Sequence, residues 1–166
     1  LVDPGNYHIG FYSILKRALA SRNLTYDDID IIATTHTHSD HAASIVHFRN
    51  KPWVIGMKEF HDMEAIEGKE IVNAKKSMMG EIIEISDNNE TKIMEDMYAI
   101  TTPGHTSGHI SFVVKSDEST VLIAGDQTMT KEEYCDRKFS RWYPEENLKQ
   151  LNESLDKAQS YKPDLV

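Results

Sequence analysis

Apolar residues recur along the chain at two spacings, one typical of helices and one typical of strands. Helical spacing, with apolar side chains on one face, is found over residues 9–19, 42–49, 58–66 and, after Pro144, 148–158. Short apolar runs predict buried strands over residues 29–33, 53–55 and 82–85, near 93, and over 98–101, 110–114 and 121–124.

Strands and helices alternate in the first half of the chain. The second half reads as consecutive strands with short polar connections and a turn at 87–89, which is typical of an antiparallel meander. Residues 1–5 read as the end of a strand leading into a turn, and residues 162–166 as the start of another strand. The pattern predicts a single α/β domain of mixed sheets.

Composition restricts the class of protein. With 39% hydrophobic and 27% charged residues among 166, the chain is neither disordered nor fibrous, and no apolar run approaches the ~20 residues of a membrane-spanning helix. The formal net charge of -9 disfavours non-specific binding to nucleic acid. A single cysteine, Cys135, excludes a disulfide framework and a cysteine-rich zinc site. No signal peptide is visible, so a cytoplasmic location is expected.

The histidines are concentrated in one place. Three of the 8 lie in the segment His36-Thr37-His38-Ser39-Asp40-His41, directly after the strand predicted at 29–33. Residues two apart in an extended segment face the same side, so His36 and His38 can present imidazoles to one point. Asp40 and His41, at the start of the next helix, can serve a neighbouring point. Alone, Asp40 reads as a helix N-cap and each histidine as a loop residue; together they predict ligands of zinc or a similar ion.

Two later residues extend this set. The turn Thr102-Pro103-Gly104-His105-Thr106-Ser107-Gly108-His109 displays His105 at the end of a predicted strand, and turn chemistry explains Pro103 and Gly104 but not His105. Asp126, in Ala124-Gly125-Asp126, ends the apolar strand at 121–124. In isolation Asp126 reads as an ordinary turn residue.

In this order, with Asp3-Pro4-Gly5 preceding them, the motifs resemble the metallo-β-lactamase superfamily, and in particular its glyoxalase II-like metallohydrolases. The resemblance implies a four-layer αββα sandwich of two mixed sheets. It also implies two metal ions, expected to be zinc, with iron or manganese as alternatives. The implied ligands are His36, His38 and His105 for one ion, Asp40 and His41 for the second, and Asp126 as the bridging carboxylate.

By the same resemblance, the activity is expected to be that of a metal-dependent hydrolase. A metal-bound hydroxide, oriented by Asp40 as the catalytic carboxylate, would attack a small thioester or ester. The partner is then a small-molecule substrate, with no nucleic acid and no membrane, and the oligomeric state is open. Two alternatives stay open: a single-iron enzyme resembling the persulfide dioxygenases, and a nuclease, which the net charge disfavours.

Some expectations concern the edges of this site. The family's last metal ligand is a histidine after the final helix and strand, and the 166 residues contain none there. We therefore hypothesise that residues 1–166 form one domain that is incomplete at both ends; without that histidine, the second ion would bind weakly. His109 is expected to pack or to support a ligand. Tyr134, Trp142 and Tyr143 are expected to pack, with a role in the substrate cleft as the less favoured alternative.

Overall fold

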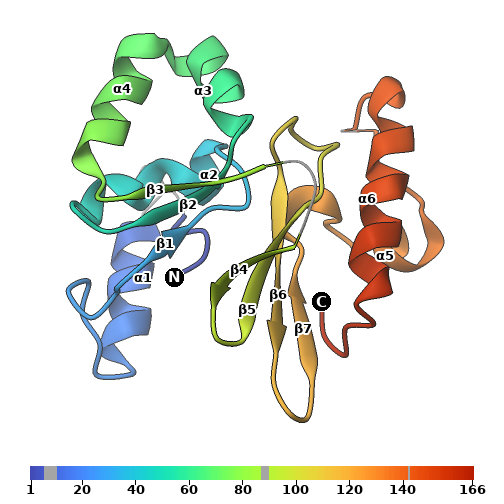
Figure 1. Cartoon of the computed structure of the whole chain (residues 1–166), viewed down its shortest axis with the longest axis horizontal. Helices are drawn as coiled ribbons and strands as arrows, with labels where there is room; N and C mark the ends of the chain where they lie inside the picture. The colour runs from blue at the N-terminus through green and yellow to red at the C-terminus, as the bar shows by residue number, and fades with distance from the viewer. Residues whose placement is uncertain (6–10, 87–89, 142) are drawn as a thin grey trace. The chain divides into compact units, whose positions relative to one another are not determined.

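The computed structural model describes residues 1–5, 11–86, 90–141 and 143–166 (Figure 1). It divides into two compact units, Leu1–Ile55 with Glu59–Glu84, and Gly56–Lys58 with Ile85–Val166. The first two residues of the helix predicted at 9–19, the turn predicted at 87–89 and Trp142 lie outside the described residues. Among the described residues, no helix is both long enough and apolar enough to cross a membrane. The cytoplasmic location stays a prediction.

The first unit contains a three-stranded sheet and several helices (Figure 1). Its elements are α1 (Phe11–Ala20), β1 (Ile32–Ala33), α2 (Ser39–Ala42), the 3-10 helix η1 (Ala43–His47), β2 (Trp53–Gly56), α3 (Glu59–Glu67), α4 (Lys69–Met78) and β3 (Ile82–Ile85). The strand order is β1-β2-β3, and β1 runs parallel to β2. Val2 adds a parallel bridge to Ala33, so residues 1–5 do lead out of a strand-like segment.

The core of this unit fixes the backbone that leads to the histidine segment. Trp53, Phe48 and Ile32 are fully or almost fully buried and pack with residues of α3 and α4. The Trp53 ring meets Phe60 edge to face at 5.6 Å between centroids. Its indole Nε1 donates to Thr34 Oγ1 at 3.0 Å. The chain is therefore anchored two residues before His36.

The second unit contains a four-stranded antiparallel sheet and two α-helices (Figure 1). Its elements are β4 (Thr91–Met94), β5 (Met97–Thr101), β6 (Ile110–Lys115), β7 (Thr120–Ile123), the 3-10 helix η2 (Gly125–Gln127), α5 (Lys131–Asp136), the 3-10 helix η3 (Glu145–Asn147) and α6 (Leu148–Ser160). The order β4-β5-β6-β7 confirms the predicted meander. Ile100, Val113 and Leu122 pack against Ala158 of α6 in the core.

The predicted α/β class with two sheets is confirmed, and differences concern individual elements. Only Ile32–Ala33 of the strand predicted at 29–33 is paired as a strand. The helix predicted at 42–49 begins at Ser39 and continues as a 3-10 helix. Helices α4 and α5 were not predicted. Helix α4 buries only Val72 among its described residues.

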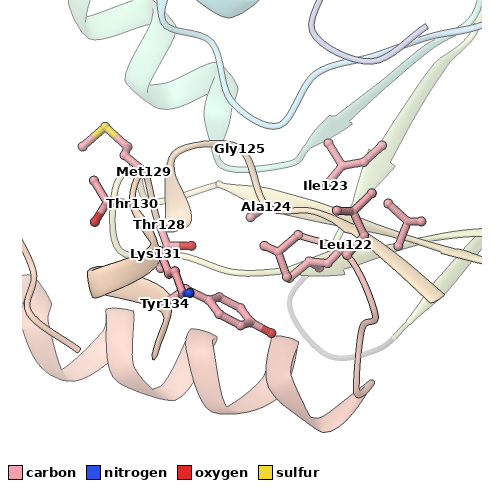
Figure 2. A pocket seen from close by; sticks show the side chains of 12 residues that line it. Leu122, Ile123, Ala124, Gly125, Thr128, Met129, Thr130, Lys131 and Tyr134 are labelled. Carbon is pink, nitrogen blue, oxygen red and sulfur yellow. The ribbon is translucent and has the colours of Figure 1, made fainter. Parts of the chain in front are cut away.

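A groove of about 710 Å³ lies beside the end of β7 (Figure 2). Leu122 to Gly125 line one side, and residues from Thr128 to Tyr134 line the other. Leu165 forms a parallel bridge with Val121, and Leu122 N donates to Leu165 O at 2.8 Å. Within the stretch 162–166, where a strand was predicted to start, the structure has a single bridge at Leu165 and no strand.

Candidate metal centre

The first unit brings together the ligands predicted between residues 36 and 41. His36 precedes α2 in an extended segment, His38 is the N-cap of α2, and His41 lies in its first turn. The His36 ring lies 4.6 Å from the His38 ring and 4.2 Å from the His41 ring, between centroids. Possible ligand nitrogens of His36 lie within 4.8 Å of those of both neighbours. The N-cap of α2 is His38 and not Asp40, so helix capping does not explain why an aspartate stands at position 40.

Asp40 lies beside this group at the protein surface. Its Oδ2 is 3.7 Å from His41 Nε2, and its side chain is 62% exposed. The carboxylate is therefore accessible to a metal ion or to a water molecule next to His41. Its role as a ligand and as the catalytic carboxylate stays a prediction.

The carboxylate of Asp3 sets the proton positions on two of these histidines. Its Oδ1 accepts from Thr35 N at 2.8 Å, and its Oδ2 accepts from Thr35 Oγ1 at 2.8 Å. Oδ2 also lies 3.0 Å from His41 Nδ1. A carboxylate can only accept, so His41 carries a proton on Nδ1, and Nε2 is the nitrogen that remains to bind a metal ion.

The same reasoning extends to His36 through Thr35. The hydroxyl of Thr35 has one proton, which it donates to Asp3. Its 3.1 Å contact with His36 Nδ1 is therefore a hydrogen bond that His36 donates. The His36 proton is on Nδ1, and Nε2 carries the lone pair that a metal ion needs. Outer hydrogen bonds of this kind orient metal-binding histidines and fix their tautomers.

Backbone contacts hold Asp3 in place. Asp3 has a positive φ of 45° and Gly5 a φ of 87°, so this segment forms a tight turn. Gly5 N donates to His41 O, and Ser44 N donates to Gly5 O, each at 2.9 Å. The sequence analysis noted Asp3 only as part of a motif. Its two roles depend on contacts more than thirty residues away in the chain.

A buried acid on α3 holds the residue between the first two histidines. Glu59 is fully buried, and its Oε2 accepts from Thr37 N at 2.8 Å and from Thr37 Oγ1 at 2.9 Å. Bonds to a charged acceptor are stronger than neutral ones, so Glu59 restrains the 36–38 segment. Sequence analysis missed it. The available signal was an acidic residue four positions before the buried Met63, on the apolar face of a helix.

The second unit brings together His105 and Asp126. His105 Nε2 lies 3.5 Å from Asp126 Oδ2, and the two side chains are 15% and 21% exposed. Asp126 follows Gly125, whose φ of 57° lets the chain turn at the end of β7. One imidazole and one carboxylate are thus paired at the ends of two segments that are far apart in the sequence.

Helix α6 holds the turn that carries His105. Ser154 Oγ donates to Pro103 O at 2.7 Å, and Asn147 Nδ2 donates to Gly104 O at 2.8 Å. Gly104 has a φ of 144°, and a Cβ placed on it would lie 2.6 Å from Leu151 Cγ. Only glycine allows the turn to approach the helix so closely.

A buried chain of hydrogen bonds connects this turn to the end of β7. Ser111 Oγ donates to Ala124 O at 3.1 Å and so accepts from Thr102 Oγ1 at 2.7 Å. Thr102 Oγ1 then accepts from His109 Nδ1 at 2.9 Å. The fully buried His109 therefore braces the two segments that display His105 and Asp126. Of the two roles considered for His109, packing and hydrogen-bond support, these bonds favour the second.

Tyr143 packs beside this pair. Its hydroxyl donates to the backbone oxygen of Asp126 at 2.9 Å, and its ring lies edge to face with His105 at 5.9 Å between centroids. Burial raises the pKa of Tyr143 well above its ordinary value, and the charges of Glu133 and Asp126 add to this. The phenol is neutral and serves as packing and as a donor to the backbone.

The donor set suits a divalent transition metal. Imidazole nitrogens and carboxylate oxygens are ligands that zinc prefers, and His36 and His41 are already in the tautomer that leaves Nε2 as the donor. The residues present therefore fit the expected metal. Four of the six predicted ligands lie in the first unit, and His105 and Asp126 lie in the second.

Comparisons with known proteins also indicate a metal-binding protein. A profile of the metallo-beta-lactamase superfamily matches residues 1–166. A probable metallo-hydrolase of Methanocaldococcus jannaschii is 33% identical over 132 residues, covering 76% of this chain and 60% of that protein. An N-acyl homoserine lactonase of Bacillus thuringiensis is 27% identical over 136 residues, covering 79% of this chain and 53% of the lactonase.

A solved structure supports the fold. An N-acyl homoserine lactone hydrolase with N-hexanoyl-L-homoserine bound at its catalytic metal centre has a TM-score of 0.73 and 24% identity, covering 92% of this chain and 60% of that chain. This likeness concerns the fold alone. The chain spans 53% to 60% of the length of these relatives. Because the profile covers every residue of the sequence, the chain belongs to the metallo-β-lactamase superfamily.

Proposed function

We propose that the two groups of residues form one centre for two divalent metal ions, and that the protein is a metal-dependent hydrolase of small esters or lactones. One ion would be held by His36, His38 and His105. The other would be held by Asp40 and His41, with Asp126 shared between the ions. Zinc suits these donors.

The observation that carries this proposal is the hydrogen-bond network of Asp3. It fixes the protons of His36 and His41 on Nδ1 and leaves both Nε2 atoms as bases. Because both Nδ1 atoms are engaged in these hydrogen bonds, Nε2 is the nitrogen that each imidazole can offer to a metal ion. The network therefore supports a site that is organised for a cation.

The chemistry follows from these residues. Two divalent cations held here would polarise a carbonyl oxygen and lower the pKa of a bound water to about 7. Asp40, 3.7 Å from His41 Nε2 and largely exposed, would orient the attacking water and accept its proton. His105 and Asp126 would be held in position by the bracing chain through Thr102.

An ester or lactone is the favoured substrate class among those that the resemblance implies. One relative is an N-acyl homoserine lactonase, which supports ester-type chemistry. The net charge of -9 argues against a polyanionic nucleic acid. A thioester stays within the same reaction class, because attack occurs at the same kind of carbonyl carbon.

We also propose that residues 1–166 are part of a longer domain. The relatives are longer than the matched region. The groove beside β7 supports the proposal as well, because Leu165 forms an isolated parallel bridge there and the apolar Met129 and Val166 are about half exposed at its sides. A following segment would pair with β7 and supply the missing histidine. An intact mass of 19.0 kDa for the native gene product would refute this proposal.

The test of the function combines metal content with a substrate panel. Elemental mass spectrometry of the full-length native protein, purified without added metal, should give about two zinc or manganese ions per chain. The loaded protein should hydrolyse a γ-lactone and a p-nitrophenyl ester, and removal of the metal should abolish both activities. One iron per chain with oxygen consumption on a persulfide, or cleavage of a phosphodiester without ester hydrolysis, would contradict the proposal.

A further inference from the structure

A small pocket lies directly beside the candidate ligands of the first unit. It has a volume of about 300 Å³ and lies between the 37–40 segment and the end of α3. Its lining residues are Thr37, His38, Ser39, Asp40, Met63, Ile66 and Glu67. The pocket is at the lower end of the roughly 300–1,000 Å³ of small-molecule sites. His38 and Asp40, two proposed metal ligands, form part of its wall.

Two of the three lining residues on α3, Met63 and Ile66, are apolar. Met63 is 2% exposed and belongs to the core of the unit, so it forms a fixed surface. Ile66 is 72% exposed, the largest exposure among the large hydrophobic side chains of the described residues. A single exposed isoleucine is common at protein surfaces. What distinguishes Ile66 is its position, because it lines the pocket together with the buried Met63.

The charges around the pocket disfavour an anionic occupant. Asp40 and Glu67 are both acidic, and no lysine or arginine is among the seven lining residues. Glu67 is paired with Lys75, whose Nζ lies 2.6 Å from Glu67 Oε2. Lys75 is engaged in this ion pair, and the lining residues include no lysine or arginine, so the pocket offers no such cation to bind a carboxylate. An uncharged, apolar group fits these walls.

We propose that this pocket binds the acyl chain of an uncharged ester or lactone substrate, and that Ile66 is a specificity-determining residue. This inference rests on the proposed function, because the carbonyl would have to lie at the metal centre next to His38 and Asp40. A volume of 300 Å³ equals about ten waters at ~30 Å³ each. The pocket therefore suits acyl chains of roughly four to eight carbons.

The experiment compares Ile66→Asp with a matched control, Ile71→Asp. Ile71 is also an exposed isoleucine, on the neighbouring α4, but it does not line the pocket. The KM and kcat of the zinc-loaded proteins are measured with p-nitrophenyl acetate and p-nitrophenyl hexanoate. Each buried methylene contributes roughly four-fold in affinity. Ile66→Asp should therefore raise the KM for the hexanoate at least ten-fold, and leave the acetate and both kcat values nearly unchanged.

A binding measurement separates this inference from the proposed function. Hexanamide, an uncharged probe that keeps the acyl chain, is titrated into the protein while the methyl NMR signals of Met63 and Ile66 are followed. Shifts at the Met63 methyl that Ile66→Asp abolishes and Ile71→Asp retains would support the pocket, even if neither ester were hydrolysed. Unshifted methyls, or equal loss of both esters in Ile66→Asp, would overturn it. Absence of ester hydrolysis in the wild-type protein would contradict only the proposed function.

Discussion

The role of Asp3 can be tested by a change that preserves its shape, Asp3→Asn. The two carboxylate oxygens accept from three donors, namely N and Oγ1 of Thr35 and Nδ1 of His41. Asparagine offers one acceptor and one donor group. If its oxygen replaces Oδ2, its amino group meets Thr35 N–H, and two donors oppose each other. If its oxygen replaces Oδ1, its amino group faces Thr35 Oγ1 and His41 Nδ1.

The second orientation reverses the proton positions on both histidines. Thr35 Oγ1 would accept from the asparagine and turn its proton toward His36 Nδ1, 3.1 Å away. His41 Nδ1 would also become an acceptor. Both imidazoles would then carry their protons on Nε2, the nitrogen assigned to the metal.

The size of the effect follows from these bonds. In the first orientation, one buried donor loses its acceptor, which costs about 1–3 kcal/mol of folding free energy. In the second, a metal ion binds only after both tautomers reverse. Changes to the outer partner of a metal-binding histidine weaken metal affinity by about 10–100-fold. We expect an affinity loss of that order, and metal-free protein that still folds.

The assay is zinc affinity, measured by competition with a chromophoric chelator. Imidazole nitrogen chemical shifts in the metal-free protein report which nitrogen carries the proton. The matched control is Asp28→Asn, because Asp28 Oδ2 also accepts from N and Oγ1 of a threonine, Thr25, in an exposed turn. The reasoning is refuted if Asp3→Asn keeps wild-type zinc affinity and Nδ1-protonated imidazoles, or if the control weakens zinc binding equally.

Three further predictions concern stability. Gly104→Ala should lower the free energy of unfolding by about 1–3 kcal/mol, because φ is 144° and the added Cβ would lie 2.6 Å from Leu151 Cγ; an unchanged melting temperature would contradict this. Glu59→Ala should lower the free energy of unfolding, measured with denaturant, by about 2–4 kcal/mol, because both Thr37 donors lose a charged acceptor. Glu59→Gln keeps an acceptor oxygen and should cost less. Equal losses of stability in the two variants would argue against the assigned bonds. Burial, with Glu90 nearby, raises the pKa of Tyr161 from 10.0 to about 12. Its contribution to stability is therefore complete below pH 10 and is lost as the pH rises through 12, so urea midpoints at pH 9 and 11 should differ less in Tyr161→Phe than in the wild-type protein.

Local sequence signals predicted most elements and missed helices α4 and α5. The meander from Thr91 to Ile123 was predicted because each strand is a short apolar run between turn residues. Helix α5 was missed, although its capping pattern was present in the sequence: Thr130 Oγ1 accepts from Glu133 N at 3.2 Å. Six residues form too short a helix for a periodic signal to stand out.

The clustering of the histidines was predictable because it depends on the local chain, whereas their roles as ligands stay a prediction. His36 and His38 face one point since an extended segment repeats every two residues, and His41 follows at the first turn of a helix. His105 was indicated because turn chemistry explained its neighbours and did not explain it. These inferences depend on spacings of a few residues, which can be read directly from the sequence.

The residues that support the ligands were decided only by the tertiary structure. Asp3 meets Thr35 and His41 across 32 and 38 positions, and Glu59 meets Thr37 across 22. No periodic pattern specifies such partners, because they depend on how the core brings distant segments together. By itself the sequence determined the ligand types and the family resemblance. The tertiary structure decided which imidazole nitrogen carries the lone pair, since proton position depends on a hydrogen-bond partner far away in the chain.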